Sequence, residues 1–433
     1  MNKSISYGLI TILFLATFSV AQFPKIKLPK LNAPETPKAG KEIGNKTGTS
    51  GGKYRQNVID DGYTFFEAKP VTERSEKYRG DISKGWTMTA HLRAFGTYPK
   101  SSGFNVVVSK GGKPLSKMFC EGETYRRSED QDPRTRNSPD DDYLMTAPSY
   151  GCYDEKKFVA GVGTFDVQVS SVNGDTDEEE VLRTYKIEVK EAKKIRPGNI
   201  PGVTDYFIQR HAEASASILY LRPSTASGGV KHGYQNINGG SYLKGNVDIF
   251  FNVAITNSAI NFSGVPSVRC SVNGERVKFE NDGQVKEASV RGDTVKWERD
   301  GKAPQFLGFY QYWINLPIVW NGQGQSGNPD MTRKTGNWEC ELRNKNEIIR
   351  KFKWTVASNG FPVEHAEQAS GNMNLHWGAY LIETEFPSDE NSIGERLMPM
   401  PNAGLFYGVQ WKSDEGKRMA ANVPKVGEPY FVQ

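Results

Sequence analysis

Apolar and polar residues alternate along many short segments of this chain, which is the pattern of half-buried β-strands. In GNWECEL, residues 336–342, the alternation places Trp338 and Cys340 on one face of a strand and polar residues on the other. In SVRCSV, residues 267–272, the same rule directs Cys270 to the apolar face. Few segments repeat apolar residues at the helical period, so we predict an all-β protein with few, short helices.

Several of the predicted strands occur twice. The matched pairs are GTFDVQV with GNWECEL (from Gly163 and Gly336), VLRTYKIEV with IIRKFKWTV (from Val181 and Ile348), and VVVSKGG with VRCSVNG (from Val106 and Val268). A duplication of this extent predicts two similar modules. In the alignment Val108 corresponds to Cys270 and Val167 to Cys340, so Val108 and Val167 should be neighbours in a core.

The repeat predicts two tandem antiparallel β-sandwich modules, residues 55–195 and 204–358. At about 140 to 155 residues, each is long enough to bury its own core. The segment KKIRPGNIPG, residues 193–202, connects them, either as a semi-rigid rod or as an ordinary domain linker.

The remaining residues, 359–433, form a β-rich C-terminal extension. It contains the aromatic, strand-like runs LHWGAYLIETEF and GLFYGVQW, and then SDEGKRMAA, in which Ser413 is a helix cap. The default expectation is that the extension packs against the second module. The alternative is that it completes a neighbouring copy by strand addition, so that the protein assembles with itself.

Four cysteines are present, and their positions favour one disulfide within each module, Cys120 with Cys152 and Cys270 with Cys340. No CxxC or similar cluster suggests a redox or metal-binding thiol. Because the strand phase directs both Cys270 and Cys340 inward, their sulfurs can meet across a sandwich interior.

An early-strand cysteine, a late-strand cysteine about 70 residues on and tryptophans between them resemble an immunoglobulin-like core. The resemblance is one of architecture, not of any specific family. It implies an immunoglobulin-like sandwich for the second module. The first module departs from it, with Val108 and Val167 in place of the two cysteines.

Residues 1–21 have the pattern of a cleaved secretory signal peptide, with Lys3 near the start, an apolar run over 9–16 and Val20 and Ala21 before Gln22. Threonine and serine interrupt the run, which argues against a membrane anchor. We predict cleavage near Ala21 and export to the extracellular space, the cell surface or the periplasm. No later segment is long and apolar enough to predict a transmembrane helix.

Residues 22–54 are rich in lysine, proline and glycine, which predicts a flexible arm. Seven lysines against two glutamates give the arm a charge of +5, equal to the formal net charge of the whole chain. The basic balance therefore belongs to the arm and does not predict nucleic-acid binding. The arm is either a solvated spacer or a contact for an anionic envelope polymer.

Candidate chemistry is sparse. The oxygen-rich clusters at residues 173–180 and 128–142 are compatible with calcium but lack an EF-hand spacing, so solvated turns are the preferred interpretation and no cofactor is predicted. Trp320 leads into the amide-rich loop NGQGQSGNPD, and an aromatic ring beside amides can hold a sugar. The candidate glycan-binding residues are Trp320, Asn321, Gln323, Gln325 and Trp377, and core packing is the competing interpretation for the tryptophans.

The sequence shows no convincing set of acid, base and nucleophile. We therefore predict a secreted, non-catalytic structural or attachment protein of the cell surface or periplasm. Its partner would be another copy of the chain or an envelope component. A glycan-binding module that takes a polysaccharide through the Trp320 loop is the second hypothesis, and an enzyme of unrecognised type is the third.

Overall fold

The computed structural model describes residues 58–76, 80–96, 98–99, 101–126, 143–148, 151–154, 158–193, 204–208, 216–223, 234–237, 240–243, 245–256, 265–279, 283–290, 295–297, 305–320, 328–375, 378–385, 405–406 and 408–421. These residues form 25 strands, two short α-helices and one 3-10 turn, η1 (Met331–Arg333). The all-β prediction is therefore confirmed. Among the described residues, no helix has the length and apolar content needed to cross a membrane.

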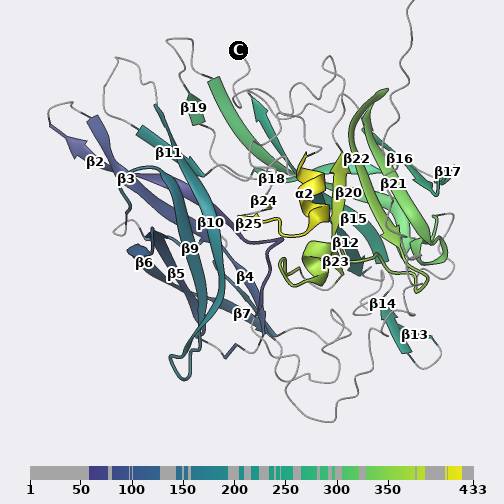
Figure 1. The fold of residues 1–433 in the computed structure, drawn as a ribbon, viewed down its shortest axis with the longest axis horizontal. Helices are drawn as coiled ribbons and strands as arrows, with labels where there is room; N and C mark the ends of the chain where they lie inside the picture. The colour runs from purple at the N-terminus through teal and green to yellow at the C-terminus, as the bar shows by residue number, and fades with distance from the viewer. Residues whose placement is uncertain are drawn as a thin grey trace, which may run out of the picture. The chain divides into compact units, whose positions relative to one another are not determined.

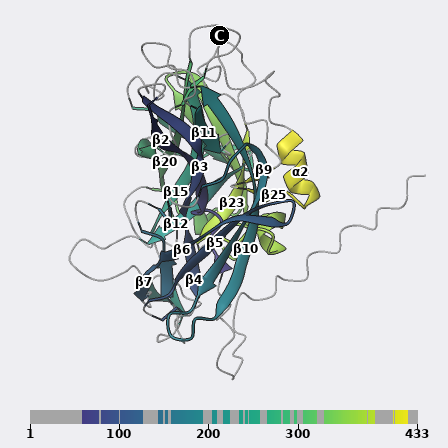
Figure 2. The same cartoon turned by 90° about the vertical axis from the view of Figure 1, so that its left-hand side faces the viewer.

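The first half of the chain consists of two antiparallel sheets and a long hairpin (Figures 1 and 2). One sheet has the order β11-β10-β9-β5-β6, with β5 at Gly103–Lys110, β6 at Lys113–Glu121, β9 at Gly163–Val172, β10 at Glu179–Lys193 and β11 at Thr204–Ile208. The other has the order β1-β4-β8-β7, with β1 at Val58–Ile59, β4 at Arg93–Gly96, β7 at Glu123–Arg126 and β8 at Tyr143–Thr146. The hairpin joins β2 (Phe65–Ser75) to β3 (Gly80–His91).

Buried side chains connect the hairpin to the five-stranded sheet. Trp86 of β3 packs edge to face against Phe165 of β9, with ring centroids 5.1 Å apart. The disulfide between Cys120 and Cys152 joins β6 to a segment that pairs with Ala90 of β3. The bridge predicted for the first module is thus present, and it fastens one layer of the core to the other.

The second half builds one continuous antiparallel sheet that curls into a half-barrel around its core (Figure 1). Its strand order is β17-β16-β21-β22-β23-β12-β15-β20-β18, and β19 also pairs with β20. The bounds are β12 at Ala216–Pro223, β15 at Gly245–Thr256, β16 at Ser267–Val272, β17 at Glu275–Arg276, β18 at Gln284–Val290, β19 at Val295–Trp297, β20 at Gln305–Trp320, β21 at Gly336–Asn344, β22 at Glu347–Val356 and β23 at Ala379–Glu385. Two short hairpins, β13 (Tyr234–Ile237) with β14 (Gly240–Leu243) and β24 (Leu405–Phe406) with β25 (Val409–Gln410), stand apart from this sheet. The tandem immunoglobulin-like sandwich is therefore not what the second half shows.

The disulfide of the second half differs from the prediction in its geometry. Cys270 and Cys340 are bonded, but they lie directly opposite each other on the neighbouring strands β16 and β21, with their Cα atoms 4.1 Å apart. An immunoglobulin-like bridge would instead join two facing sheets. The prediction of an inter-sheet bridge was wrong because alternation determines which face a cysteine occupies, whereas its partner on that face can come from an adjacent strand.

The repeated strands pair in the same way in both halves. β5 pairs with β9 and β9 with β10 in the first half, as β16 pairs with β21 and β21 with β22 in the second. Val108 lies opposite Val167, as Cys270 lies opposite Cys340. The expectation that the two valines are core neighbours is confirmed. The repeated segments are this hairpin and the strand that pairs with its first strand, β5 in the first half and β16 in the second.

The described part of the C-terminal extension packs within the chain. β23 pairs with β22 on one side and with β12 on the other, so it is an interior strand of the ten-stranded sheet. The helices α1 (Ala366–Ala369) and α2 (Asp414–Ala421) follow in the same region. A small core forms there on the outer face of the sheet, from side chains that include Ile218, Leu381, Trp411 and Met419. Strand addition through β23 to a neighbouring copy is not available, because both of its edges are occupied.

A buried polar cluster holds the start of the extension against the first half. Asp61 lies 2.8 Å from Arg183 of β10 and accepts hydrogen bonds from the hydroxyl of Tyr185 (2.8 Å) and the main-chain N–H of Asn374 (2.6 Å). The main-chain N–H of Asp61 in turn donates to the carbonyl oxygen of Asn374 at 2.8 Å. Both carboxylate oxygens of Asp61 therefore have partners, whereas the buried Nε of Arg183 has none among the described residues.

Three predicted segments lie outside the described residues. They are the signal segment at 1–21, the basic arm at 22–54 and most of the linker at 193–202. The predictions for them stay predictions.

Candidate binding groove

The outer face of the duplicated hairpin in the second half forms the floor of a groove. Alternation buries Trp338, Cys340 and Phe352 on the inner face of β21 and β22, so the residues between them face outward. The outward residues of the groove floor are Asn337, Glu339, Lys353 and Thr355. The groove has a volume of about 740 Å³ and is open to solvent.

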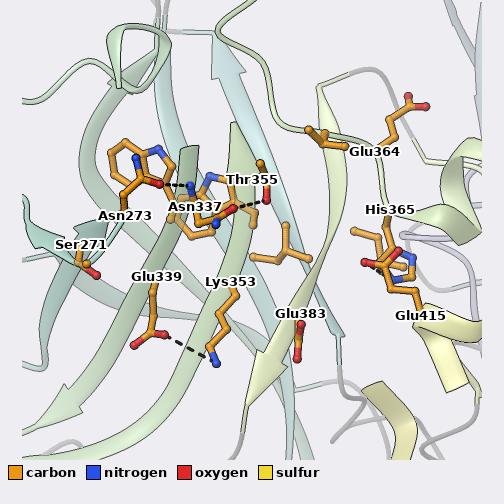
Figure 3. Close-up of a pocket in the computed structure, with 16 residues that line it drawn as sticks. Ser271, Asn273, Asn337, Glu339, Lys353, Thr355, Glu364, His365, Glu383 and Glu415 are labelled. Carbon is orange, nitrogen blue, oxygen red and sulfur yellow. Dashed lines mark hydrogen bonds and ion pairs between the residues drawn. The ribbon is translucent and has the colours of Figure 1, made fainter. Parts of the chain in front are cut away.

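The extension supplies the wall of the groove (Figure 3). Glu364 and His365 lie between β22 and α1, Glu383 belongs to β23, and Glu415 lies in the first turn of α2. Glu364 and His365 are held beside the floor because the main-chain N–H of Val363 donates to the carbonyl oxygen of Thr355 at 2.8 Å, Glu383 reaches the floor through the pairing of β23 with β22, and Glu415 contacts His365. The groove therefore exists only because the extension docks in cis.

An asparagine at the tip of β16 fixes one end of the floor. Asn273 has φ of 51° and Gly274 has φ of 83°, the left-handed pair that a tight Asn-Gly hairpin turn requires. The side-chain oxygen Oδ1 of Asn273 accepts the main-chain N–H of Asn337 at 2.9 Å, and the Thr355 hydroxyl donates to the side-chain oxygen of Asn337 at 2.9 Å. A Cβ at Gly336 would lie 2.3 Å from the Asn273 side chain, so only glycine fits there.

Charged groups at the groove are partly compensated. Lys353 pairs with Glu385 and lies 3.7 Å from Glu339. The hydrogen bond to Glu385 raises the pKa of Lys353, so the lysine stays charged. Glu383 is paired with Arg418 of α2 at 3.1 Å. Within the lining itself, four carboxylates stand against the single cation Lys353, and the lining is acidic.

His365 is held neutral. Its Nδ1 accepts the main-chain N–H of Glu367 at 3.1 Å, so the proton of the neutral ring is on Nε2. Burial lowers the pKa of His365, although Glu415 lies 3.5 Å away. Neither Nε2 of His365 nor the indole Nε1 of Trp354 has a hydrogen-bond partner among the described residues. Both residues line the groove, but these two N–H groups are buried.

Glu367 positions the wall. Its buried carboxylate accepts hydrogen bonds from the main-chain N–H groups of Lys412 (2.7 Å) and Ser413 (2.6 Å), from the Ser413 hydroxyl (2.8 Å) and from the Asn372 amide. Burial opposes the charge, but these hydrogen bonds hold the pKa of Glu367 below its usual value. Ser413 caps α2 as predicted, by accepting the N–H of Gly416 at 3.0 Å. Glu367 thereby fixes the end of α2 that carries Glu415.

The predicted glycan-binding residues do not meet at this groove. Trp320 is 0% exposed and packs against Phe361 in the inner core, so its ring has no surface that a sugar could stack on. The competing interpretation, core packing, describes this tryptophan. Asn321, Gln323, Gln325 and Trp377 lie outside the described residues.

The acidic segment at residues 173–180 forms the tip of the β9–β10 hairpin, where the Asn173 side chain accepts the main-chain N–H groups of Asp175 and Thr176. The second acidic cluster, at 128–142, lies outside the described residues. No group of three or more metal-ligating side chains occurs in the part of the chain that the structure describes.

None of the groove carboxylates stands out in the sequence. Glu339 and Glu383 occupy ordinary outward positions of strands, and Glu364 and Glu415 are isolated acids in the extension. The one available signal was the prediction that the extension packs against the second module. That prediction indicated the region of the site but not its residues.

Comparisons with known proteins gave no match, whether against protein-family models, curated proteins or solved structures.

Proposed function

We propose that this chain is an exported, non-catalytic attachment protein that binds a partner molecule in the acidic groove of its curled sheet. The two disulfides indicate an oxidising compartment outside the cytoplasm. The signal-like segment supports export with cleavage near Ala21. The observation that carries the proposal is the open groove of about 740 Å³, whose polar lining is built on strands.

Rigid support is what a binding surface of this kind needs. Asn337, Lys353 and Thr355 project from two strands that are covalently and hydrophobically fixed on their inner face, where Cys340 is bonded to Cys270. Side chains held on strands in this way lose little conformational freedom when a ligand binds. The volume is within the usual range for a ligand site.

Of the partners that the sequence suggests, a protein or another envelope component fits the groove better than a stacked sugar. The tryptophans at the floor expose almost none of their surface, 1% for Trp338 and 6% for Trp354. Carboxylates, amides, a hydroxyl and the exposed side chain of Val363 contribute to the accessible lining instead. Recognition here would rest on charge and hydrogen bonds.

The proposal is tested with a substitution that places a large side chain in the groove. Thr355 is exposed on the floor, and Thr355→Trp would fill part of it. Thr184→Trp is the matched control, because Thr184 is an exposed threonine on β10, the equivalent strand of the first half. The mature chain, residues 22–433 with both disulfides formed, would be passed over immobilised basic, acidic and neutral peptides and over neutral and acidic polysaccharides.

Retention of wild type and Thr184→Trp on at least one of these materials, with retention of Thr355→Trp reduced about tenfold, a change of about 1.4 kcal/mol, would support the proposal. A protein that no material retains, or one that Thr355→Trp leaves unchanged, would overturn it. Circular dichroism of each variant excludes loss of the fold as the cause.

A further inference from the structure

We infer that the ligand of the groove is an extended peptide segment of a partner protein that carries lysine side chains. This inference rests on the proposed function, and it names the chemistry that the groove would select. Three observations lead to it: the charge of the lining, the hydrogen-bonding side chains of the floor and the dimensions of the floor.

The charge of the lining favours a cation. Glu339, Glu364, Glu383 and Glu415 contribute four negative charges, Lys353 contributes one positive charge, and His365 is neutral, which leaves a net charge of −3. Opposite charge attracts a ligand and orients it, whereas an anionic ligand would be repelled.

The compensation of these acids is uneven. Glu339 lies near Lys351 and Lys353, and Glu383 is paired with Arg418. Glu364 has no ion-pair partner within the described part of the chain, and Glu415 contacts the neutral His365 and the main-chain N–H of Ala366, with Arg418, already paired to Glu383, as its nearby cation. The negative charge that a ligand can neutralise is therefore on the wall built by the extension (Figure 3).

Hydrogen-bonding groups favour a peptide over a bare cation. The floor presents side chains that form hydrogen bonds, whereas the Nε2–H of His365 and the Nε1–H of Trp354 are buried and do not reach a ligand. The amides of Asn273 and Asn337 and the hydroxyl of Thr355 can both donate and accept, as a peptide main chain does. A divalent metal ion would need a cluster of ligands, and the described residues contain none.

The floor fits a short extended segment. It crosses β16, β21, β22 and β23, which are neighbours in the sheet. With strands about 4.8 Å apart, this width is about 14 Å, the length of about four residues of extended chain. A peptide of that length places alternate side chains on one side, so two lysines could face the wall.

The test measures binding of three labelled peptides to the full mature protein by fluorescence anisotropy. The peptides are acetyl-GKAKAKG-amide, its counterpart with the lysines replaced by glutamine, and its counterpart with the lysines acetylated. We expect the lysine peptide to bind at least about tenfold more tightly than either counterpart. We also expect this preference to weaken between about 0.02 and 0.3 M salt, because added ions screen exposed charges.

Variants then locate the interaction. Glu364→Gln and Glu415→Gln should each weaken binding of the lysine peptide about three- to fivefold, as expected for exposed ion pairs. Glu121→Gln, at an exposed carboxylate on β6 in the first half, is the matched control and should have no effect. If the wall variants and the control bind the lysine peptide equally, the inference is wrong.

The outcomes separate the inference from the proposed function. If all three peptides bind equally and Thr355→Trp abolishes this binding, the lysine preference is overturned, but the proposed attachment function of the groove is not. Retention on a polysaccharide alone, again lost in Thr355→Trp, would have the same meaning. No binding of any peptide or polysaccharide would overturn both.

Discussion

Asp61 and Arg183 form a buried ion pair with an oxygen-to-nitrogen distance of 2.8 Å, and this pair ties β10 of the first half to the segment that leads into β23. The Asp61 side chain is fully buried, so it has exchanged all its water for Arg183, the Tyr185 hydroxyl and the N–H of Asn374. A contact of this kind makes stability depend on pH.

Replacing Asp61 should change that dependence. Burial raises the pKa of Asp61 from 3.8 to about 7, although Arg183 opposes the shift. Between these values the folded protein holds a proton that the unfolded chain has released, so the stability contributed by this group is complete below about pH 4 and is lost as the pH rises to about 7. We therefore expect the difference in unfolding free energy between wild type and Asp61→Asn to decrease from pH 4.5 to pH 7.5. Urea titrations at several pH values measure it, and parallel pH profiles would contradict the assignment.

Glu367→Gln should loosen α2. The amide can keep its oxygen toward Lys412 and Ser413, but its N–H group then lies against the donating side-chain amide of Asn372, so we expect a loss of about 1–3 kcal/mol. Because the pKa of Glu367 is lowered in the folded state, the deficit should be present above about pH 4.5 and diminish at lower pH. Chemical denaturation and limited proteolysis of the region around α2 report on it. The control is Glu415→Gln. Glu415 is an exposed acid on α2, and its replacement should leave stability nearly unchanged.

The duplicated hairpin predicts which residues can replace its disulfide. The double variant Cys270→Val and Cys340→Val reproduces the Val108–Val167 pair of the first half and should fold. The loss of a 70-residue closed loop should cost about 4 kcal/mol on the loop-entropy model. The corresponding double serine variant should be less stable still, since it buries two hydroxyls. Thermal denaturation ranks the three proteins. A serine pair as stable as the valine pair would show that the two hairpins are not equivalent.

Gly336→Ala should disturb the floor of the groove. The new Cβ would meet the Asn273 side chain at 2.3 Å, and the φ of 118° disfavours any side chain. We expect a loss of about 1–3 kcal/mol together with weaker ligand binding. In Gly163→Ala, the equivalent position of the first half, φ is 115°, and the nearest atom is the flexible end of Lys110 at 3.4 Å. This control carries the backbone strain without the collision, and equal effects of the two substitutions would exclude a role for Asn273.

Local patterns in the sequence predicted the strands and their faces. Trp338 and Cys340 face the core as alternation requires, and the equivalence of Val108 with Cys270 is visible in the pairing. The pairing of cysteines within each half also followed from position alone. These features depend on short-range periodicity and on the duplication, both of which can be read from one chain.

The arrangement of the second half depends on long-range pairing that no local pattern encodes. The insertion of β23 between β12 and β22 joins strands that are about 30 to 160 residues apart in the chain, and it turns an expected sandwich into one curled sheet. Part of the groove follows from that insertion, because Glu383 of β23 lies beside Lys353 of β22 only through it. The residue types at these positions are ordinary for solvated strands and helix ends, so they did not indicate a site.

The position of β23 also bears on how the polypeptide reaches its final state. Because β23 follows β12 by about 160 residues, β12 and β22 cannot be joined until the chain has been made as far as residue 385. The hairpin of β21 and β22 can form earlier, since its contacts are local, and the bridge from Cys340 to Cys270 of β16 needs the chain only as far as Cys340. Folding of this half would thus finish with the insertion of β23 between β22 and β12. A truncated product that stops before residue 379 would retain two unjoined sheet edges.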